Sequence, residues 1–156
     1  MKVTVVAVGK PRKLFAAAIT EYEKRAARYF SFETSEVKEE SARGGIGSGQ
    51  VCREEGTRLL TRVPEGTELI AMDVDGQQWS SEELARYLGR LALDGHPGPT
   101  FVIGGAYGLS EELLVKSRHK LSLSAFTFPH ELARLMLAEQ LYRAGTIIRK
   151  EPYHKS

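Results

Sequence analysis

Short apolar runs alternate with helical patterns along this chain, and this alternation limits the folds open to it more than any other feature. Residues 3–8, 69–74 and 100–103 are almost wholly apolar and rich in β-branched side chains. Runs of this length are typical of strands that are buried on both faces. Elsewhere apolar residues recur at helical spacing, as at Leu14 and Ala18. Strands that alternate with helices predict an α/β domain with a mostly parallel sheet flanked by helices.

Turn and capping residues divide the first half of the chain. Residues 32–37 alternate between polar and apolar positions and are a weaker strand candidate. The glycine-rich residues 43–49 predict an internal loop, and Leu59 belongs to the helix expected after it. Ser80 with Glu83 three residues later is the pattern of a capping box, which predicts the start of the next helix.

Similar signals mark the second half. The Asp-Gly pair at 75–76 is expected to close the strand before it, and Ser110 is expected to cap a short helix. Residues 121–128 predict the last strand. Pro129 is expected at the first position of the final helix, where its missing N–H costs nothing. Gly145 is the expected end of that helix.

The final helix is apolar on nearly all of its sides. A surface helix of a globular protein usually carries one apolar stripe. Either this helix lies centrally in the monomer, or one of its faces packs on a second subunit, and in so small a chain we favour the second. Its apolar positions are Leu132, Leu135, Met136, Leu137, Leu141 and Tyr142.

Length and composition narrow the class of protein. At 156 residues the chain is expected to be a single domain over residues 1–156. No stretch approaches the roughly 20 apolar residues that span a bilayer, and the first apolar run is too short for a secretory signal, so we expect a cytoplasmic protein. Cys52 is the only cysteine, which excludes an internal disulfide, and no spacing suits a metal. A net charge of +2 does not by itself mark a nucleic-acid binder.

Glycines and polar residues gather where the predicted strands end, the edge at which open α/β sheets bind ligands. Residues 104–108, GGAYG, are either a tight turn or a loop that lets a ligand approach the backbone. Their spacing disfavours a Rossmann dinucleotide site and a P-loop. No nucleophile–base pair stands out, so hydrolase chemistry has no support. His130 is either a capping or core residue or a polar group that faces a pocket, with Arg134 one turn later.

Four motifs closely resemble a known family. They are VIGGAYGLS at 102–110, LSLSAFTFPH at 121–130, EQLYRA at 139–144 and PYH at 152–154. In this order they resemble the RlmH family, the ribosomal large-subunit pseudouridine N3-methyltransferases of the SPOUT class. The resemblance covers the whole chain, is densest after residue 68 and is loosest over residues 11–49.

The resemblance implies a fold and a cofactor. The C-terminal segment would thread a loop and form a deep trefoil knot, which general topology rules exclude. S-adenosylmethionine would lie bent in this knot as the methyl donor, with no metal. The residues carried over as its contacts are Met72, Gly104, Gly105, Leu123, Ser124, Ala125, Phe126, Thr127 and Phe128.

The resemblance also implies a homodimer in which the tail of one subunit completes the site of the other. The methyl group would pass directly to N3 of a pseudouridine in a stem-loop of large-subunit (23S) rRNA, within the subunit or the assembled ribosome. This reaction needs in-line positioning and removal of the N3 proton. The polar residues expected around the base are His130, Arg134, Tyr142, Arg143, Tyr153 and His154.

The sequence leaves two other functions open. One is a different SPOUT-type RNA methyltransferase that acts on tRNA or on a ribose hydroxyl, and the PYH motif at 152–154 argues against it. The other is a non-catalytic module that binds RNA or the ribosome. The intact residues 104–108 and 123–128 argue against that alternative.

Overall fold

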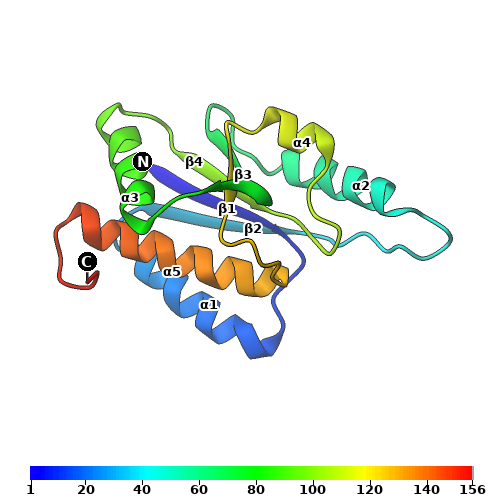
Figure 1. Cartoon of the computed structure of the whole chain (residues 1–156), viewed down its shortest axis with the longest axis horizontal. Coiled ribbons are helices and arrows are strands. Elements are labelled where there is room, and N and C mark those ends of the chain that lie inside the picture. Colours follow the sequence, from blue (N-terminus) through cyan, green and yellow to red (C-terminus); the bar gives the residue numbers. More distant parts are fainter. Residues whose placement is uncertain (156) are drawn as a thin grey trace.

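A computed structural model describes residues 1–155 and contains a five-stranded sheet with helices on both faces (Figure 1). In chain order the elements are β1 (Lys2–Val8), α1 (Lys13–Ala26), β2 (Ser31–Val37), α2 (Ser48–Leu60), β3 (Glu68–Gln78), α3 (Ser81–Leu93), β4 (Pro99–Ile103), α4 (Glu111–Lys116), β5 (His119–Ser122) and α5 (His130–Ile148). Every pair of neighbouring strands is parallel, in the order β2-β1-β4-β3-β5. The predicted α/β class with a parallel sheet is confirmed.

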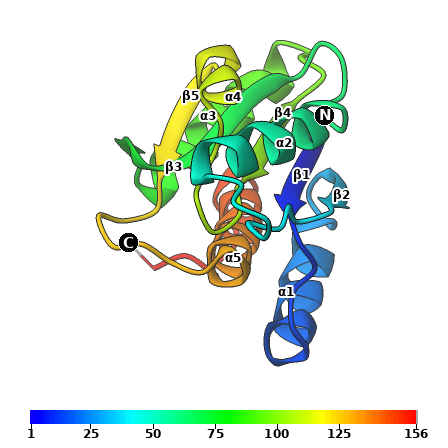
Figure 2. The same cartoon turned by 90° about the vertical axis from the view of Figure 1, so that its right-hand side faces the viewer.

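Two apolar cores lie on opposite faces of the sheet. Successive residues of a strand point to opposite faces, so Val5 joins the core under α1, α3 and α5, whereas Val6 joins the core under α2 and α4. Figures 1 and 2 show α1 and α5 on the opposite side of the sheet from α2 and α4. All residues of the central strand β4 are buried. This double covering explains why the strands are apolar without alternation.

The predicted helix caps are confirmed. The N–H of Glu83 donates to Ser80 Oγ at 3.1 Å, and the N–H of Ser80 donates back to the Glu83 carboxylate at 2.6 Å. At the start of α4, the N–H of Leu113 donates to Ser110 Oγ at 3.2 Å. Each hydroxyl satisfies an N–H that has no partner within its own helix, which sets the first residue of α3 and of α4.

Two predicted strand boundaries are wrong. β3 does not stop before residue 75 but continues to Gln78, because its pairing with β5 shifts register between Met72 and Gln77. β5 ends at Ser122 instead of continuing to residue 128. There the Ser122 hydroxyl donates to the carbonyl of Ser124 at 2.8 Å, and the chain leaves the sheet.

Both ends of the final helix differ from the prediction. α5 begins at His130, so Pro129 holds the N-cap position and not the first helical position. The helix also passes through Gly145 and ends at Ile148. Any side chain at Gly145 would collide with the ring of Tyr29. This glycine therefore permits close packing beside the end of α1 and is not a stop signal.

The apolar character of α5 has two sources. The helix packs against both α1 and α3, and Leu137 and Leu141 are fully buried beneath it. Leu132, Leu135 and Met136 stay half-buried and form an outer apolar strip. Central packing thus accounts for part of the pattern and leaves the outer strip only partly covered in the single chain. Within residues 1–155, no helix combines the length and apolarity needed to cross a membrane.

Candidate functional site

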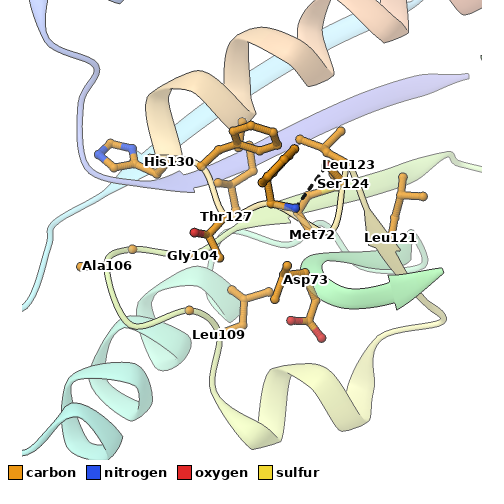
Figure 3. Close-up of a pocket in the computed structure, with 17 residues that line it drawn as sticks. Met72, Asp73, Gly104, Ala106, Leu109, Leu121, Leu123, Ser124, Thr127 and His130 are labelled. Carbon is orange, nitrogen blue, oxygen red and sulfur yellow. Dashed lines mark hydrogen bonds between the residues drawn. The ribbon is translucent and has the colours of Figure 1, made fainter. Parts of the chain in front are cut away.

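A pocket opens at the edge of the sheet where β4 and β5 end and where β3 changes register (Figure 3). The labelled residues in the figure come from β3, from the segment after β4, from β5 and the segment that follows it, and from the first residue of α5. All of the predicted cofactor contacts line this pocket except Ala125. Those that line it are Met72, Gly104, Gly105, Leu123, Ser124, Phe126, Thr127 and Phe128.

The segment after β4 is a tight turn that also forms one wall of the pocket. Gly108 N–H donates to the carbonyl of Gly105 at 3.1 Å, and Gly108 has a φ of +83°, a conformation that favours glycine. A Cβ on Gly104 would lie 2.8 Å from the backbone of Gly108, so the first glycine is also needed. The thiol of Cys52 donates to the carbonyl of Tyr107 at 3.2 Å. GGAYG is therefore a tight turn that also lines the pocket, and its contact with a ligand stays a prediction.

The opposite wall is the segment that leaves β5. Ser124 Oγ accepts the N–H of Phe126 at 3.1 Å, which fixes a local turn. Phe126 is 78% exposed, although it also lines the pocket. Ala106 and Gly108 also line the pocket and belong to the predicted loop 104–108, whereas several other lining residues were not predicted as contacts: Asp73, Val74, Ile103, Leu109, Leu121 and Ala133. Asp73 follows a predicted contact directly and Ala133 lies one helical turn after His130, so both had a detectable signal.

His130 begins α5 and lines the pocket, as the second of its two interpretations requires. Its imidazole packs against Gly9 at the end of β1. A Cβ on Gly9 would lie 3.4 Å from His130 Cε1 and 3.7 Å from Glu39 Oε2. These are ordinary contact distances, so the imidazole and the carboxylate both border the backbone at Gly9, where a φ of +80° favours glycine.

Arg134 follows His130 by one turn but faces a different part of the molecule. Its Nε donates to Glu23 Oε1 on α1 at 2.9 Å, and its Nη1 donates to Glu36 Oε1 on β2 at 2.7 Å. The side chain is 6% exposed and is not among the residues that line the pocket. Arg134 therefore joins α1, β2 and α5, and it lies apart from the site where it was predicted.

The other predicted polar residues gather around Glu139, at the middle of α5. Arg143 Nη2 donates to Glu139 Oε1 at 2.6 Å, and the Tyr153 hydroxyl donates to the same oxygen at 3.0 Å. The rings of Tyr142 and Tyr153 lie 4.5 Å apart between centroids. Burial and the bond to Glu139 raise the pKa of Tyr153 to about 12. Its phenol therefore keeps its proton at neutral pH and acts as a hydrogen-bond donor.

His154 is held from both sides. Its Nδ1 lies 3.2 Å from Arg143 Nη1, and its Nε2 lies 2.8 Å from Glu82 Oε1. Because a guanidinium only donates, Nδ1 is the acceptor and Nε2 carries the hydrogen that points to Glu82. The tail is thereby fixed on α3 and α5 of its own chain.

His130, which lines the pocket, is the first residue of α5, whereas the C-terminal tail follows the other end of this helix (Figure 1). α5 contains 19 residues. At a rise of about 1.5 Å per residue it is about 28 Å long. The tail turns back along the helix, so that Tyr153 reaches Glu139, nine residues or about 14 Å of helix after His130. Within a single chain, the predicted catalytic residues therefore form two separate groups.

Comparison with known proteins places this architecture in a family. The family model described as "Predicted SPOUT methyltransferase" matches residues 1–154. The chain is 46% identical to ribosomal RNA large subunit methyltransferase H of Acetivibrio thermocellus, over 99% of this chain and 100% of that protein. It is 47% identical to the protein of the same name from Pelotomaculum thermopropionicum, over 97% and 98%.

A solved structure supports the fold. A probable methylase family protein from Haemophilus influenzae Rd KW20 is similar with a TM-score of 0.56 and 11% identity, over 99% of this chain and 70% of that chain. At this identity the likeness concerns the fold alone. The two relatives, by contrast, are 46% and 47% identical to this chain over nearly their full length. The chain therefore belongs to the SPOUT methyltransferases and, among them, to the family of ribosomal RNA large subunit methyltransferase H.

Proposed function

We propose that this protein methylates large-subunit ribosomal RNA, and that it transfers the methyl group from S-adenosylmethionine to N3 of a pseudouridine in a stem-loop. The family match supports methyl transfer, and the names of the relatives support a ribosomal RNA substrate. The observation that carries the proposal is the pocket at the carboxyl edge of the sheet, whose walls are the two segments with the family motifs. The nucleoside and the atom come from the resemblance of those motifs.

The pocket residues suit the proposed methyl donor. Apolar side chains such as Met72, Leu109 and Leu123 match its adenine ring and carbon chain, while the hydroxyls of Ser124 and Thr127 match its polar groups. The turn after β4 brings backbone, not side chains, to the wall. S-adenosylmethionine supplies an electrophilic methyl group on its sulfonium. The protein has to bind it, orient it and exclude water.

The proton on N3 must leave when the new N–CH₃ bond forms. Two predicted groups are imidazoles, of which His130 can accept this proton, whereas both ring nitrogens of His154 are occupied by Arg143 and Glu82 and His154 would have to release one of them first. Arg143 is a fixed cation that can stabilise the developing anion or hold a phosphate. Tyr153, as a protonated phenol, can orient the base and offers a ring on which an unstacked base can lie.

The separation of these groups supports a homodimer with a shared site. A two-fold dimer formed through the outer strip of α5 would bring the tail of one subunit to the pocket of the other. Leu132, Leu135 and Met136 supply the apolar surface that such an interface needs. The trefoil knot expected from the resemblance remains a prediction and belongs to this proposal.

Incubation of the purified protein with labelled S-adenosylmethionine tests the proposal. We expect label in the large-subunit rRNA, and mass mapping of the digested RNA should place it on N3 of one pseudouridine. Free rRNA, the large subunit and the assembled ribosome are offered in parallel, which identifies the substrate. A matched RNA with uridine at the target should take up no label. Label in tRNA or on a ribose would instead support the alternative SPOUT activity.

A further inference from the structure

One side of α2 packs against the turn after β4. Cys52, Glu55 and Gly56 lie three and four positions apart, so they share one side of the helix. Cys52 donates its thiol hydrogen to a carbonyl of the turn. Gly56 packs so closely on Ser110, just after the turn, that any side chain there would collide with it. Glu55 lies between Cys52 and Gly56 in the helix, and its carboxyl group lies beside Gly105 of the turn.

Glu55 is a buried carboxyl group whose hydrogen bonds are incomplete. The residue is 2% exposed. Its Oε2 accepts the N–H of Glu40 at 3.1 Å, whereas Oε1 has no hydrogen-bond partner among residues 1–155. Leaving a buried polar atom unpaired is unfavourable, and native proteins do so rarely. A glutamate at this position therefore requires an explanation other than stability.

The carboxyl group of Glu55 fits the underside of Gly105. A Cβ on Gly105 would lie 2.9 Å from Glu55 Oε1 and 3.1 Å from Oε2. Both distances are shorter than normal carbon–oxygen contacts, so a side chain at position 105 would force the Glu55 carboxyl group to shift, and would also press on Val8 Cγ1 at 3.2 Å. Gly105 also lines the pocket on its other side. Gly105 thus has the Glu55 carboxyl group on one side and the pocket on the other.

We propose that Glu55 is a positioning residue, whose carboxyl group holds the turn after β4 in the conformation in which Gly104 and Gly105 form the wall of the pocket. Its effect on the methyl donor rests on the proposed function, whereas its effect on the turn does not. The neutral acid suits this position, because a charge on Oε1 would have no donor to offset it.

Some neighbours of Glu55 raise its pKa and others lower it. Burial raises the pKa of Glu55, and the N–H of Glu40 opposes that shift. The carboxylates of Glu39 and Glu40, in the segment after β2, raise it as well, and Arg58 on α2 lowers it. The other titratable group on this side of α2 is the thiol of Cys52, whose own pKa is raised by burial and by Glu55.

Hydrogen–deuterium exchange of the ligand-free protein tests the effect on the turn. We expect Glu55→Ala to speed exchange of the amides of residues 104–108 by about tenfold, because local opening of the turn loses its support. Glu55→Gln keeps the shape and has no charge, so its exchange should stay within about twofold of the unaltered protein. Equal exchange in Glu55→Ala and the unaltered protein would overturn the proposal.

A pair of substitutions tests the fit itself, with the dissociation constant of S-adenosylmethionine measured by calorimetry. Gly105→Ala should weaken binding by about tenfold, and the double variant Glu55→Ala, Gly105→Ala should recover most of that loss, because the new methyl group occupies the vacated space. Gly89→Ala is the control, since a Cβ there meets only Ile148 at an ordinary 3.9 Å. Additive losses in the double variant would contradict the proposal.

The pH dependence of binding tests the ionisation of Glu55. Titration of the ligand itself affects the unaltered protein and Glu55→Gln equally, so it cancels in the ratio of their dissociation constants. Ionisation of Glu55 places an unpaired charge under the turn, so affinity in the unaltered protein should fall, relative to Glu55→Gln, as pH rises through the pKa of Glu55. If the ratio of the two dissociation constants is the same at every pH at which both proteins are folded, ionisation of Glu55 does not affect the turn and this part of the proposal fails. If the unaltered protein binds no S-adenosylmethionine at all, the proposed function fails, and the exchange comparison still decides on Glu55.

Discussion

Replacement of Arg134 with alanine is expected to lower the free energy of unfolding by about 3 kcal/mol. Arg134 is the only cation in hydrogen-bond contact with Glu23 and Glu36 among residues 1–155. Removal of one partner from a buried ion pair typically costs about 3–5 kcal/mol, because the other charge stays behind without a partner. The carboxylate side chains are 16% and 27% exposed, so water partly solvates them and the lower end of that range applies.

Urea denaturation followed by circular dichroism measures this loss. Lys116→Ala is the matched control, because Lys116 forms an exposed pair with Glu112 in which both side chains are more than half exposed. Such surface pairs contribute less than about 1 kcal/mol. Methyl transfer by Arg134→Ala, assayed where the variant is folded, should stay within a few-fold of the unaltered protein. A large loss of activity at unchanged stability would contradict this structural role and would support the predicted place of Arg134 in the active site.

The sequence predicted the local structure of this fold better than its long-range arrangement. Strands, caps and the α/β class follow from patterns over a few residues, and the Ser80 box is an example. The strand order does not, because β4 pairs with β1 and β3 through contacts distant in sequence. The overrun of β3 past residue 75 depends on a register shift against β5, which no local pattern reveals.

The errors at α5 have the same origin. Gly145 has the usual signature of a helix end, yet its purpose is to make room for Tyr29, a residue more than a hundred positions earlier. Arg134 shares a helical face with His130 by spacing alone, but a long side chain takes its direction from its partners. Those partners, Glu23 and Glu36, lie on α1 and β2, and the sequence around Arg134 contains no pattern that identifies them.

The candidate site was predictable where it depends on backbone and motif. The strand ends indicated where a ligand would bind, and the family motifs supplied the individual pocket residues. The support beneath the pocket was not predictable, because Glu55 acts through a contact with Gly105 that only the folded chain creates. The separation of pocket and tail also required the structure, since it depends on the length and direction of α5.

A mixture of two inactive variants is expected to restore methyl transfer if the site is shared between subunits. The first variant, Gly105→Val, should lose the methyl donor, because its side chain cannot fit above Glu55. The second ends after Lys150 and lacks Tyr153 and His154. It should bind the donor but lose methyl transfer by at least about 100-fold, the effect of removing acid–base and orienting groups.

The geometry of a two-fold dimer determines the result. In a mixed dimer, the intact pocket of the truncated subunit meets the intact tail of the Gly105→Val subunit, and the other site carries both defects. Random mixing makes about half of the dimers mixed, each with one working site, so about a quarter of the activity should return. Differently tagged subunits and native mass spectrometry verify that mixed dimers form, and thermal melting verifies that both variants are folded. If mixed dimers form and activity stays absent, the tail serves the pocket of its own chain, which would require α5 to release the contacts that now fix Tyr153 and His154 on Glu139 and Glu82.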